Sequence, residues 1–182
     1  MEDHRPPEVL ITADQIRQRI HELAAAIGRD FPDGLHLVAV LKGAFVFLSD
    51  LVRALEGAVS LDFMAVASYA KRTTSSGEVR LLKDLDSSLE GRSVLVVEDI
   101  VDTGLTLTYL QEILRARNPK VLRTACLLSK PSRRTIDVTV DYIGFTIEDR
   151  FVVGYGLDFD EQYRNLPYIG VIPSPLPAGR QP

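Results

Sequence analysis

The amino-acid sequence predicts an α/β protein with a central, mostly parallel β-sheet flanked by helices. Short, almost purely apolar runs, such as Leu35–Leu41 and 93–97, indicate strands that are covered on both faces. Longer segments between them repeat their apolar residues every three or four positions, as on one face of a helix. Strands that alternate with helices are typical of a parallel sheet. Because the chain has no internal repeat and no linker, we expect one domain over residues 1–182.

The first helix is the most clearly marked element. Thr12 and Gln15 stand three residues apart, as in a capping box, where each side chain bonds to a backbone N–H of the first turn. An apolar stripe then extends along the helix, which should end at residues 32–34, where Pro and Gly occur. The stripe consists of Ile16, Ile20, Leu23, Ala24, Ile27 and Phe31.

The later elements follow from the same patterns. We expect helices over residues 44–55, closed by Gly57, and over residues 105–116. The expected strands cover residues 35–41, 59–69, 79–82, 93–97, 121–128, 138–145 and 151–155. Residues 70–78 carry almost no side chain that could anchor to a core, so they should be exposed and mobile. The Pro-rich tail, residues 173–182, should be frayed.

Composition favours an ordinary globular protein and argues against several kinds of partner. The apolar share of 46% and the charged share of 25% are typical of soluble domains. With a net charge of -4, a broadly basic surface for nucleic acid or an anionic membrane is not expected. No apolar run approaches the roughly 18 residues that cross a bilayer. The lone Cys126 lies in an apolar run and cannot form an internal disulfide, so we expect a cytoplasmic protein with a buried thiol.

The segment from Val94 to Leu107 carries the clearest chemical signal. An apolar strand runs directly into Glu98 and Asp99, then Asp102, and then a short polar turn that opens a helix. In an open parallel sheet, ligands bind beyond the carboxyl ends of the strands. Free N–H groups at a helix start and small hydroxyl side chains together can hold a phosphate. An acidic loop is most often merely solvated, but the buried strand before it and the turn after it favour a binding site.

Five segments in order resemble the type I phosphoribosyltransferases, and most closely the hypoxanthine–guanine branch of purine salvage. The resemblance extends from about Val9 to Ile172. Besides the acidic segment, the matching stretches are Leu41-Lys42-Gly43, Ser68-Tyr69, Lys130-Pro131-Ser132-Arg133-Arg134, and the run from Phe151 to Asp158. The family's fold implies a core over about 9–145 and a small hood formed by the N-terminal segment and about 146–172. It also implies a homo-oligomer, either a dimer or a tetramer.

The resemblance implies a reaction and a cofactor. Members of this family transfer the 5-phosphoribosyl group of phosphoribosyl pyrophosphate to N9 of hypoxanthine or guanine, with Mg²⁺, and release pyrophosphate. It assigns phosphate and pyrophosphate binding to Lys42, Gly43, Glu98, Asp99, Asp102, Thr103, Gly104, Leu105, Thr106 and Arg164. Relatives can have a cis peptide between the residues that match Leu41 and Lys42, and some carry a basic residue where this chain has Leu105.

The same resemblance assigns the more specific roles. Asp102 is the catalytic residue, a proton acceptor or partner at N7 of the purine. Glu98 and Asp99 face the ribose hydroxyls or Mg²⁺, and Asp158 faces a second Mg²⁺; hard oxygen ligands suit this cation. The purine is contacted by Lys130 at its C6 oxygen, by the stacked ring of Phe151 and by the backbone carbonyl of Val152. Ser68 and Tyr69 begin a lid over the donor. Asp160 and Glu161 are interpreted as surface residues.

Two features of the sequence bear on the position of Lys42 and Gly104. A lysine at a helix start is unusual, because the helix dipole disfavours a cation there, and a bound anion would resolve the anomaly. Gly104 would let the backbone approach a phosphate oxygen closely, since it has no Cβ.

The sequence argues against several other classes of function and leaves two alternatives open. The Gly-Lys pair of a P-loop is absent, the Gly154-Tyr155-Gly156 run lacks the third glycine of a dinucleotide site, and the three histidines are too dispersed for a metal centre. A regulator on the same fold that binds RNA or DNA remains open, with Lys130, Arg133 and Arg134 as its one tight basic group. A xanthine-preferring enzyme also remains open. The expected partners are small-molecule substrates, without nucleic acid or membrane.

Overall fold

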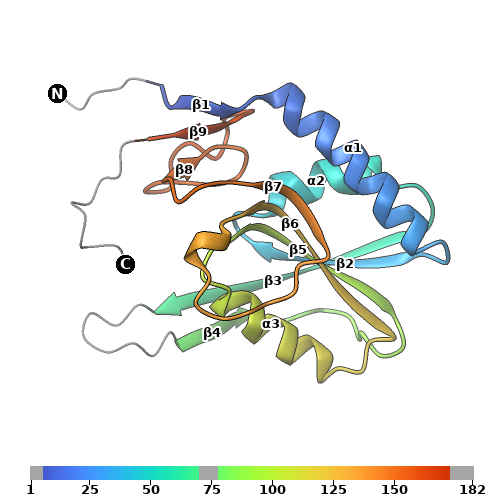
Figure 1. The fold of residues 1–182 in the computed structure, drawn as a ribbon. Coiled ribbons are helices and arrows are strands. Elements are labelled where there is room, and N and C mark those ends of the chain that lie inside the picture. The colour runs from blue at the N-terminus through green and yellow to red at the C-terminus, as the bar shows by residue number, and fades with distance from the viewer. Residues whose placement is uncertain (1–5, 70–77, 173–182) are drawn as a thin grey trace.

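The computed structural model describes residues 6–69 and 78–172. Its main feature is a six-stranded sheet (Figure 1). The strand order is β4-β3-β2-β5-β6-β7. The strands are β2 (Leu35–Leu41), β3 (Val59–Tyr69), β4 (Glu78–Lys83), β5 (Ser93–Val101), β6 (Val121–Ser129) and β7 (Tyr142–Thr146). Neighbouring strands are parallel except for β4, which pairs antiparallel with β3 at one edge. The predicted mostly parallel sheet is confirmed.

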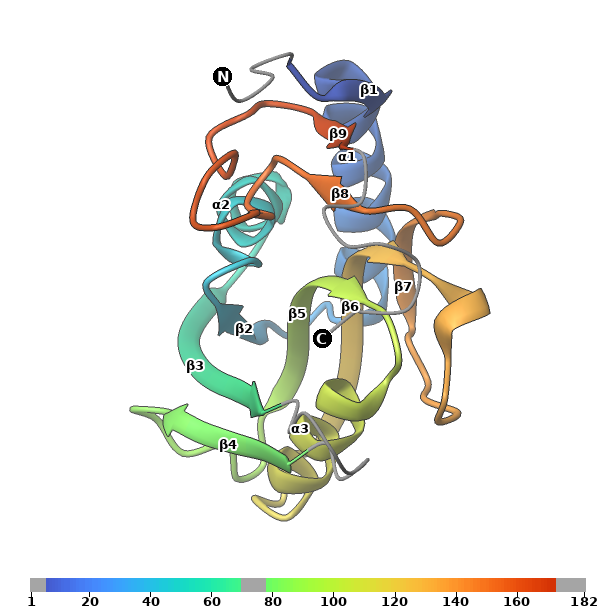
Figure 2. The same ribbon diagram turned by 90° about the vertical axis from the view of Figure 1, so that its left-hand side faces the viewer.

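Helices cover both faces of this sheet, as predicted. Helices α1 (Ala13–Asp30) and α2 (Phe45–Ala54) pack on one face, and α3 (Leu105–Arg115) packs on the other (Figure 2). The capping box of α1 is confirmed, because Gln15 N donates to Thr12 Oγ1 at 3.2 Å and Thr12 N donates to Gln15 Oε1 at 2.8 Å. The apolar stripe of α1 is buried from Ile16 to Ile27. Burial of such a stripe is the main stabilisation of a surface helix.

A second, smaller sheet joins the two ends of the described chain. Its antiparallel strands are β1 (Glu8–Ile11), β9 (Ile169–Val171) and β8 (Val152–Val153), in that order. It lies at the end of the main sheet toward which the parallel strands run (Figure 1). This arrangement places a hood of N- and C-terminal segments over the carboxyl ends of β2, β5 and β6.

Three of the predicted strands differ from the observed strands by more than one residue at an end. Strand β5 continues through Val101 instead of ending at residue 97, so Glu98 and Asp99 belong to the strand itself. The strand predicted over 138–145 begins only at Tyr142, because the preceding segment packs on α3, where Gln111 Nε2 donates to Thr139 O at 2.9 Å. The strand predicted over 151–155 is reduced to β8, since Gly154 and Tyr155 adopt positive φ angles of 96° and 51°.

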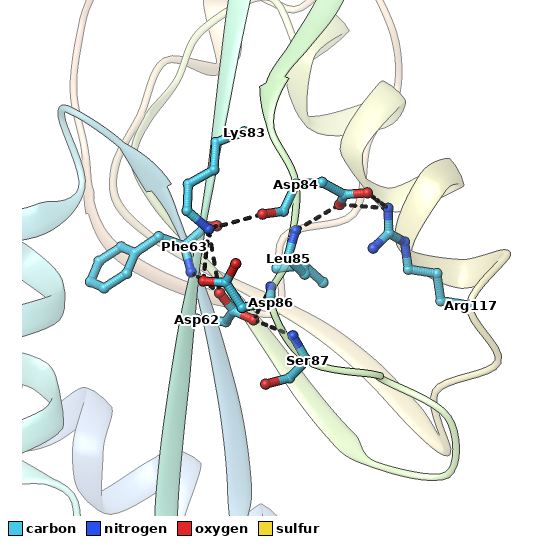
Figure 3. A network of polar contacts seen from close by, with 8 residues as sticks. All are labelled: Asp62, Phe63, Lys83, Asp84, Leu85, Asp86, Ser87 and Arg117. Atoms are coloured by element: carbon cyan, nitrogen blue, oxygen red, sulfur yellow. Dashed lines mark hydrogen bonds and ion pairs between the residues drawn. The ribbon is translucent and has the colours of Figure 1, made fainter.

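A buried carboxylate ties the β4–β5 connection to strand β3 (Figure 3). Asp62 is only 5% exposed and accepts hydrogen bonds from the backbone N–H groups of Phe63, Asp86 and Ser87 at 2.8, 2.8 and 2.9 Å. Lys83 lies beside it, with Nζ 3.8 Å from Asp62 Oδ1. Burial alone would raise the pKa of Asp62, but the three N–H donors and Lys83 outweigh it and lower the pKa. The contact therefore holds the base of the β3–β4 pair.

Several predictions fall on residues that are not described. Most of the predicted mobile segment, residues 70–77, and the whole predicted frayed tail, 173–182, lie outside the described residues. Ser68 and Tyr69 are described only as the last two backbone positions of β3, where they pair with Val79 and Glu78 of β4. Among the described helices, none combines the length and the apolar character that a membrane crossing requires.

Candidate active site

The neighbouring strands β2 and β5 end side by side, and the helices that follow them lie on opposite faces of the sheet. Strand β2 leads into α2 on one face, and its neighbour β5 leads into α3 on the other. Such a topological switch point leaves a crevice for ligands. Gly43, just after β2, lies so close to the carboxylate of Asp99 that an added Cβ would be 1.6 Å from Asp99 Oδ2. On its other side, a Cβ on Gly156 would be 2.3 Å from Gly43 O. The turn after β2, the end of β5 and the loop after β8 therefore converge on one small region.

The peptide between Leu41 and Lys42 is cis. The sequence alone left this point open. The bond lies at the end of β2, directly before Gly43, and belongs to the same region of close backbone approach.

Glu98 and Asp99 are neighbouring acids at the end of β5, where Glu98 is buried and Asp99 is half-buried. Burial raises the pKa of Glu98 well above its usual range, and the neighbouring charge of Asp99 raises it further. Burial also raises the pKa of Asp99 to about 6, although the N–H of Ile100 and the charge of Arg164 act in the opposite direction. Two adjacent carboxylates with such pKa values favour a bound cation, which would relieve their repulsion.

The turn after β5 leads directly into α3. Gly104 is the N-cap of this helix, with a φ of 91°, and it has no side chain to cap the first turn, although Leu105 N donates weakly to Thr103 Oγ1 at 3.4 Å. The backbone N–H groups of that turn have no intrahelical partner, and Thr103 and Thr106 stand beside them. The structure gives Gly104 a reason within the protein as well. A Cβ there would lie 3.0 Å from both Ile136 O and Val138 Cγ1, so the positive φ and these two neighbours both favour a glycine.

Two arginines after β6 hold this turn in place. Arg134 Nη1 donates to Val101 O at 2.6 Å and also to Asp102 O, while Arg134 Nη2 donates to Ser129 Oγ at 2.9 Å. Arg133 Nε donates to Asp102 Oδ1 at 3.2 Å. Asp102 Oδ2 accepts no hydrogen bond from any described residue, so one carboxylate oxygen is oriented by the protein and the other remains available.

Lys130 is a buried cation at the end of β6. It is 7% exposed, and its Nζ lies 3.6 Å from Asp149 Oδ1. Arg133 Nη1 lies 3.7 Å from Asp149 Oδ2, so Asp149 stands between the two cations. Through Arg133, the position of Lys130 is linked to that of Asp102. The ends of β5 and β6 thus present an acid and a cation next to each other.

The hood contributes Phe151 and Val152. Ile172 N donates to Phe151 O at 3.2 Å, and Val152 pairs with Val171 at the next position of the ladder. Because bonding alternates along an antiparallel ladder, the N–H and C=O of Val152 point away from β9, toward the free edge of β8. The Phe151 ring makes an edge-to-face contact with Phe159, with ring centroids 5.6 Å apart and an interplanar angle of 89°.

In the loop after β8, two acids pair with an arginine. Arg164 Nη2 lies 2.9 Å from Asp158 Oδ1 and 3.4 Å from Glu161 Oε1. Lys42 Nζ, from the turn after β2, donates to Glu161 Oε2 at 2.9 Å. The Lys42 ammonium holds the pKa of Glu161 below its usual range. The sequence interpretation of Glu161 as a plain surface residue is therefore incomplete, because its carboxylate joins two cations of the site.

The acidic residues of the site suit a Mg²⁺ ion that is coordinated jointly by the protein and a phosphate-containing substrate. In the described ranges, no three His, Cys, Asp or Glu side chains converge closely enough to form a metal centre of their own. Mg²⁺ commonly binds one or two carboxylates and takes its other ligands from phosphate oxygens and water. Asp99 and Asp158 fit that pattern, since they are close enough for the charge of Asp158 to raise the pKa of Asp99.

Comparison with known proteins identifies the family. The sequence model of the family described as phosphoribosyl transferase domain matches residues 11–160. This chain belongs to that family.

Individual phosphoribosyltransferases are similar over nearly the whole chain. The hypoxanthine-guanine phosphoribosyltransferase of Bacillus subtilis (strain 168) is 48% identical over 173 residues, which cover 94% of this chain and 96% of that protein. The protein of the same name from Dictyostelium discoideum is 50% identical over 168 residues, with 90% and 93% covered. A crystal structure of a hypoxanthine-guanine phosphoribosyltransferase from Bacillus anthracis matches with a TM-score of 0.88 and 45% identity, covering 92% of this chain and 99% of that one.

The phosphoribosyltransferase fold brings most of the predicted site residues to one edge of the sheet. Asp102, Lys130 and Arg133 are linked by ion pairs through Asp149, and Lys42, Asp158 and Arg164 are linked through Glu161 and each other. Gly43 connects Lys42 with Asp99, because it directly follows Lys42 in the sequence and lies against the carboxylate of Asp99.

Sequence reasoning missed Asp149 and understated Arg133, Arg134 and Glu161. The two arginines had a usable signal, because they follow closely on Lys130 at the end of a buried strand. Asp149 had no such signal in the sequence, since it lies among other charged residues in a segment with the composition of an ordinary loop.

Proposed function

We propose that this phosphoribosyltransferase transfers the 5-phosphoribosyl group of phosphoribosyl pyrophosphate to N9 of hypoxanthine or guanine, releasing IMP or GMP and pyrophosphate. The similar proteins named above carry the name of this activity. The observation that carries the proposal is the chain of ion pairs from Asp102 through Arg133 and Asp149 to Lys130. It connects a phosphate-binding turn to a buried cation that can read a base.

The ribose 5-phosphate would be held by the turn from Asp102 to Thr106. The free N–H groups at the start of α3 and the hydroxyls of Thr103 and Thr106 donate to its oxygens. Leu105 adds a backbone N–H but no charge. Arg134 and Thr135 hold the turn by hydrogen bonds to Asp102 O and Thr103 O, so the donors are in place before the ligand arrives.

Asp102 would take part in proton transfer at the base. Arg133 orients Oδ1, and Oδ2 is left to accept a proton or hydrogen bond at N7 while N9 attacks the anomeric carbon. The departing pyrophosphate would lie between Lys42, Gly43 and Arg164, whose guanidinium fork suits phosphate oxygens. Mg²⁺ would be held by Asp99, with Glu98 beside it, and by Asp158, and it would neutralise charge on the donor and leaving group. Ser68 and Tyr69 would begin a lid that keeps water from the anomeric carbon.

The base would be recognised through three contacts. The Lys130 ammonium donates to the oxygen at C6 and faces the amino group of adenine unfavourably, which selects 6-oxopurines. The ring of Phe151 stacks on the purine, and the outward-facing carbonyl of Val152 accepts from the base edge. Xanthine also has an oxygen at C6, so a xanthine preference is the variant of this proposal to be tested beside it.

The basic group that would suit a nucleic-acid-binding regulator is engaged within the site. Lys130 and Arg133 pair with Asp149, Arg133 pairs with Asp102, and Arg134 donates to backbone carbonyls. The proposed partners are therefore small molecules. We also propose that the protein acts in the cytoplasm and forms a homo-oligomer, as the family resemblance implies.

The test is nucleotide formation from phosphoribosyl pyrophosphate and Mg²⁺ with hypoxanthine, guanine, xanthine or adenine in turn. The proposal predicts rapid turnover of hypoxanthine or guanine and little with adenine. In Asp102→Asn, most turnover should be lost, while binding of the donor is retained. An inactive wild-type protein that retards RNA or DNA in a gel at moderate salt would refute the proposal and favour the regulator.

A further inference from the structure

Glu161 occupies the position between the two cations that are proposed to bind pyrophosphate. Its Oε2 accepts from Lys42 Nζ at 2.9 Å, and its Oε1 lies 3.4 Å from Arg164 Nη2. The two oxygens of one carboxylate thus face two cations: Arg164 lies in the same loop, and Lys42 is 119 residues away from Glu161 in the sequence. The bridge should contribute little to the stability of the fold, because the carboxylate is 65% exposed and Lys42 is 66% exposed.

The bridge resolves the anomaly noted for Lys42. A cation just before α2 is disfavoured by the helix dipole, and an anion nearby compensates for it, since α2 has no side-chain cap of its own. In the structure, the anion is the carboxylate of Glu161. The protein itself therefore provides the negative charge that a phosphate ligand would otherwise bring.

The backbone that carries Glu161 is held by contacts rather than by local preference. Phe159 and Gln162 exchange two backbone hydrogen bonds, at 3.2 and 3.0 Å, around a two-residue turn. Its central residues, Asp160 and Glu161, have φ angles of 51° and 60°, a conformation that favours glycine or asparagine. Glu161 N donates to Asp158 Oδ2 at 2.9 Å and so adds support to the turn. An exposed turn of this kind can change conformation without disturbing a helix or a sheet.

The cations are neutralised but not fully satisfied in this arrangement. Lys42 and Arg164 carry two positive charges, and Glu161 and Asp158 carry two negative ones. The buried Nε of Arg164 has no hydrogen-bond partner among the described residues. A diphosphate has more oxygens and more charge than one carboxylate, so it competes effectively for the same two cations.

We propose that Glu161 is an internal competitor of the diphosphate: its carboxylate occupies the pyrophosphate subsite between Lys42 and Arg164 in the free enzyme and has to leave when the donor or pyrophosphate binds. The inference rests on the proposed function, since that function places pyrophosphate on these cations. It assigns to Glu161 a tuning role, in which the carboxylate weakens binding of pyrophosphate and thereby aids its release.

The test compares binding of magnesium pyrophosphate to the full-length wild-type protein and to Glu161→Gln by titration calorimetry. Removing the competing charge should tighten binding about two- to fivefold, the scale of one exposed ion pair. The gain should shrink at high salt, because exposed charges are screened. The KM of the purine should be unchanged, since Glu161 does not face the base.

Asp160→Asn is the matched control. Asp160 is the neighbouring exposed acid on the same turn, and its side chain makes no hydrogen bond or ion pair with another described residue. The Asp160→Asn variant loses the same charge, but at a side chain that contacts neither Lys42 nor Arg164. Its affinity for magnesium pyrophosphate should therefore equal that of the wild type. In a Lys42→Met background, the gain from Glu161→Gln should be smaller, which a double-mutant cycle measures.

Three outcomes overturn the inference while leaving the proposed function intact. They are equal or weaker binding by Glu161→Gln, an equal gain in Asp160→Asn, and a wild-type protein that forms nucleotide yet binds no pyrophosphate. Weaker binding would mean that Glu161 positions the two cations instead of competing for them. A wild-type protein that neither binds pyrophosphate nor forms nucleotide would refute the proposed function, and the inference with it.

Discussion

Gly43→Ala tests the convergence of loops at the centre of the site. An added Cβ would stand 1.6 Å from Asp99 Oδ2 and 2.5 Å from Asp99 Cγ, where real Cβ atoms are never found. To restore an ordinary contact of 3.4 Å, the carboxylate or the loop has to move by about 1.8 Å. Asp99 cannot rotate freely, because its Oδ1 accepts from Ile100 N at 2.7 Å.

The expected effect on activity is larger than the effect on stability. A misplacement of about 1 Å at a catalytic site can lower turnover roughly 100-fold, so Gly43→Ala should lose at least that much in kcat/KM. Overpacking typically costs about 1–3 kcal/mol of unfolding free energy. For a chain of this length, each kcal/mol corresponds to about 2–4 °C in Tm, so the variant should stay folded at room temperature.

The assay is steady-state nucleotide formation at varied Mg²⁺, with Tm measured in parallel. Gly28→Ala is the control, because Gly28 lies in α1 and a Cβ there meets no atom within 4 Å. It should leave kcat/KM unchanged and raise stability by about 0.5–1 kcal/mol. If Gly43→Ala keeps wild-type kcat/KM, Gly43 does not lie against a functional Asp99, and the reasoning fails.

Three further predictions concern stability, pH and specificity. Asp62→Asn should lower the free energy of unfolding by about 2–4 kcal/mol, because the amide cannot accept all three backbone N–H groups (Figure 3). Because the folded-state pKa of Asp62 is lowered, the difference between wild type and variant should be constant above about pH 5 and should shrink as the pH falls below about 4. Urea unfolding at a series of pH values measures this difference. Mg²⁺ must displace a proton from Asp99 below its pKa of about 6, so the apparent Mg²⁺ affinity should fall by up to about tenfold per pH unit below that value. A flat profile in Mg²⁺ titrations from pH 5 to 8 would contradict a Mg²⁺ ligand with this raised pKa. Lys130→Gln should reduce the preference in kcat/KM for 6-oxopurines over adenine by about 10-fold or more, and an unchanged ratio would mean that another group reads C6.

The sequence predicted the sheet, the helices and the edge of the sheet that carries the site. These features depend on local patterns: the stripe of α1 and the apolar runs of β2 and β5 are legible within each segment. The short strands β1, β8 and β9 have two to four residues each, too few for periodicity to appear. Their pairing is decided by tertiary contact between the two ends of the chain.

The contacts that arrange the site were less predictable, for a physical reason. From the sequence, Arg134 is interpreted as a surface cation. In the structure it follows β6 and lies beside the carbonyls of Val101 and Asp102. Glu161 reads as a solvated acid until its turn brings it to Lys42. In both cases the partner is distant in the sequence, and only the fold brings the two together.

The most direct test of the central claim is a crystal structure of the protein with phosphoribosyl pyrophosphate and Mg²⁺. The account predicts the 5′-phosphate at the start of α3 beside Thr103 and Thr106, Mg²⁺ at Asp99, and the diphosphate between Lys42 and Arg164. Donor bound at another place, with the carboxyl end of β5 empty, would contradict it.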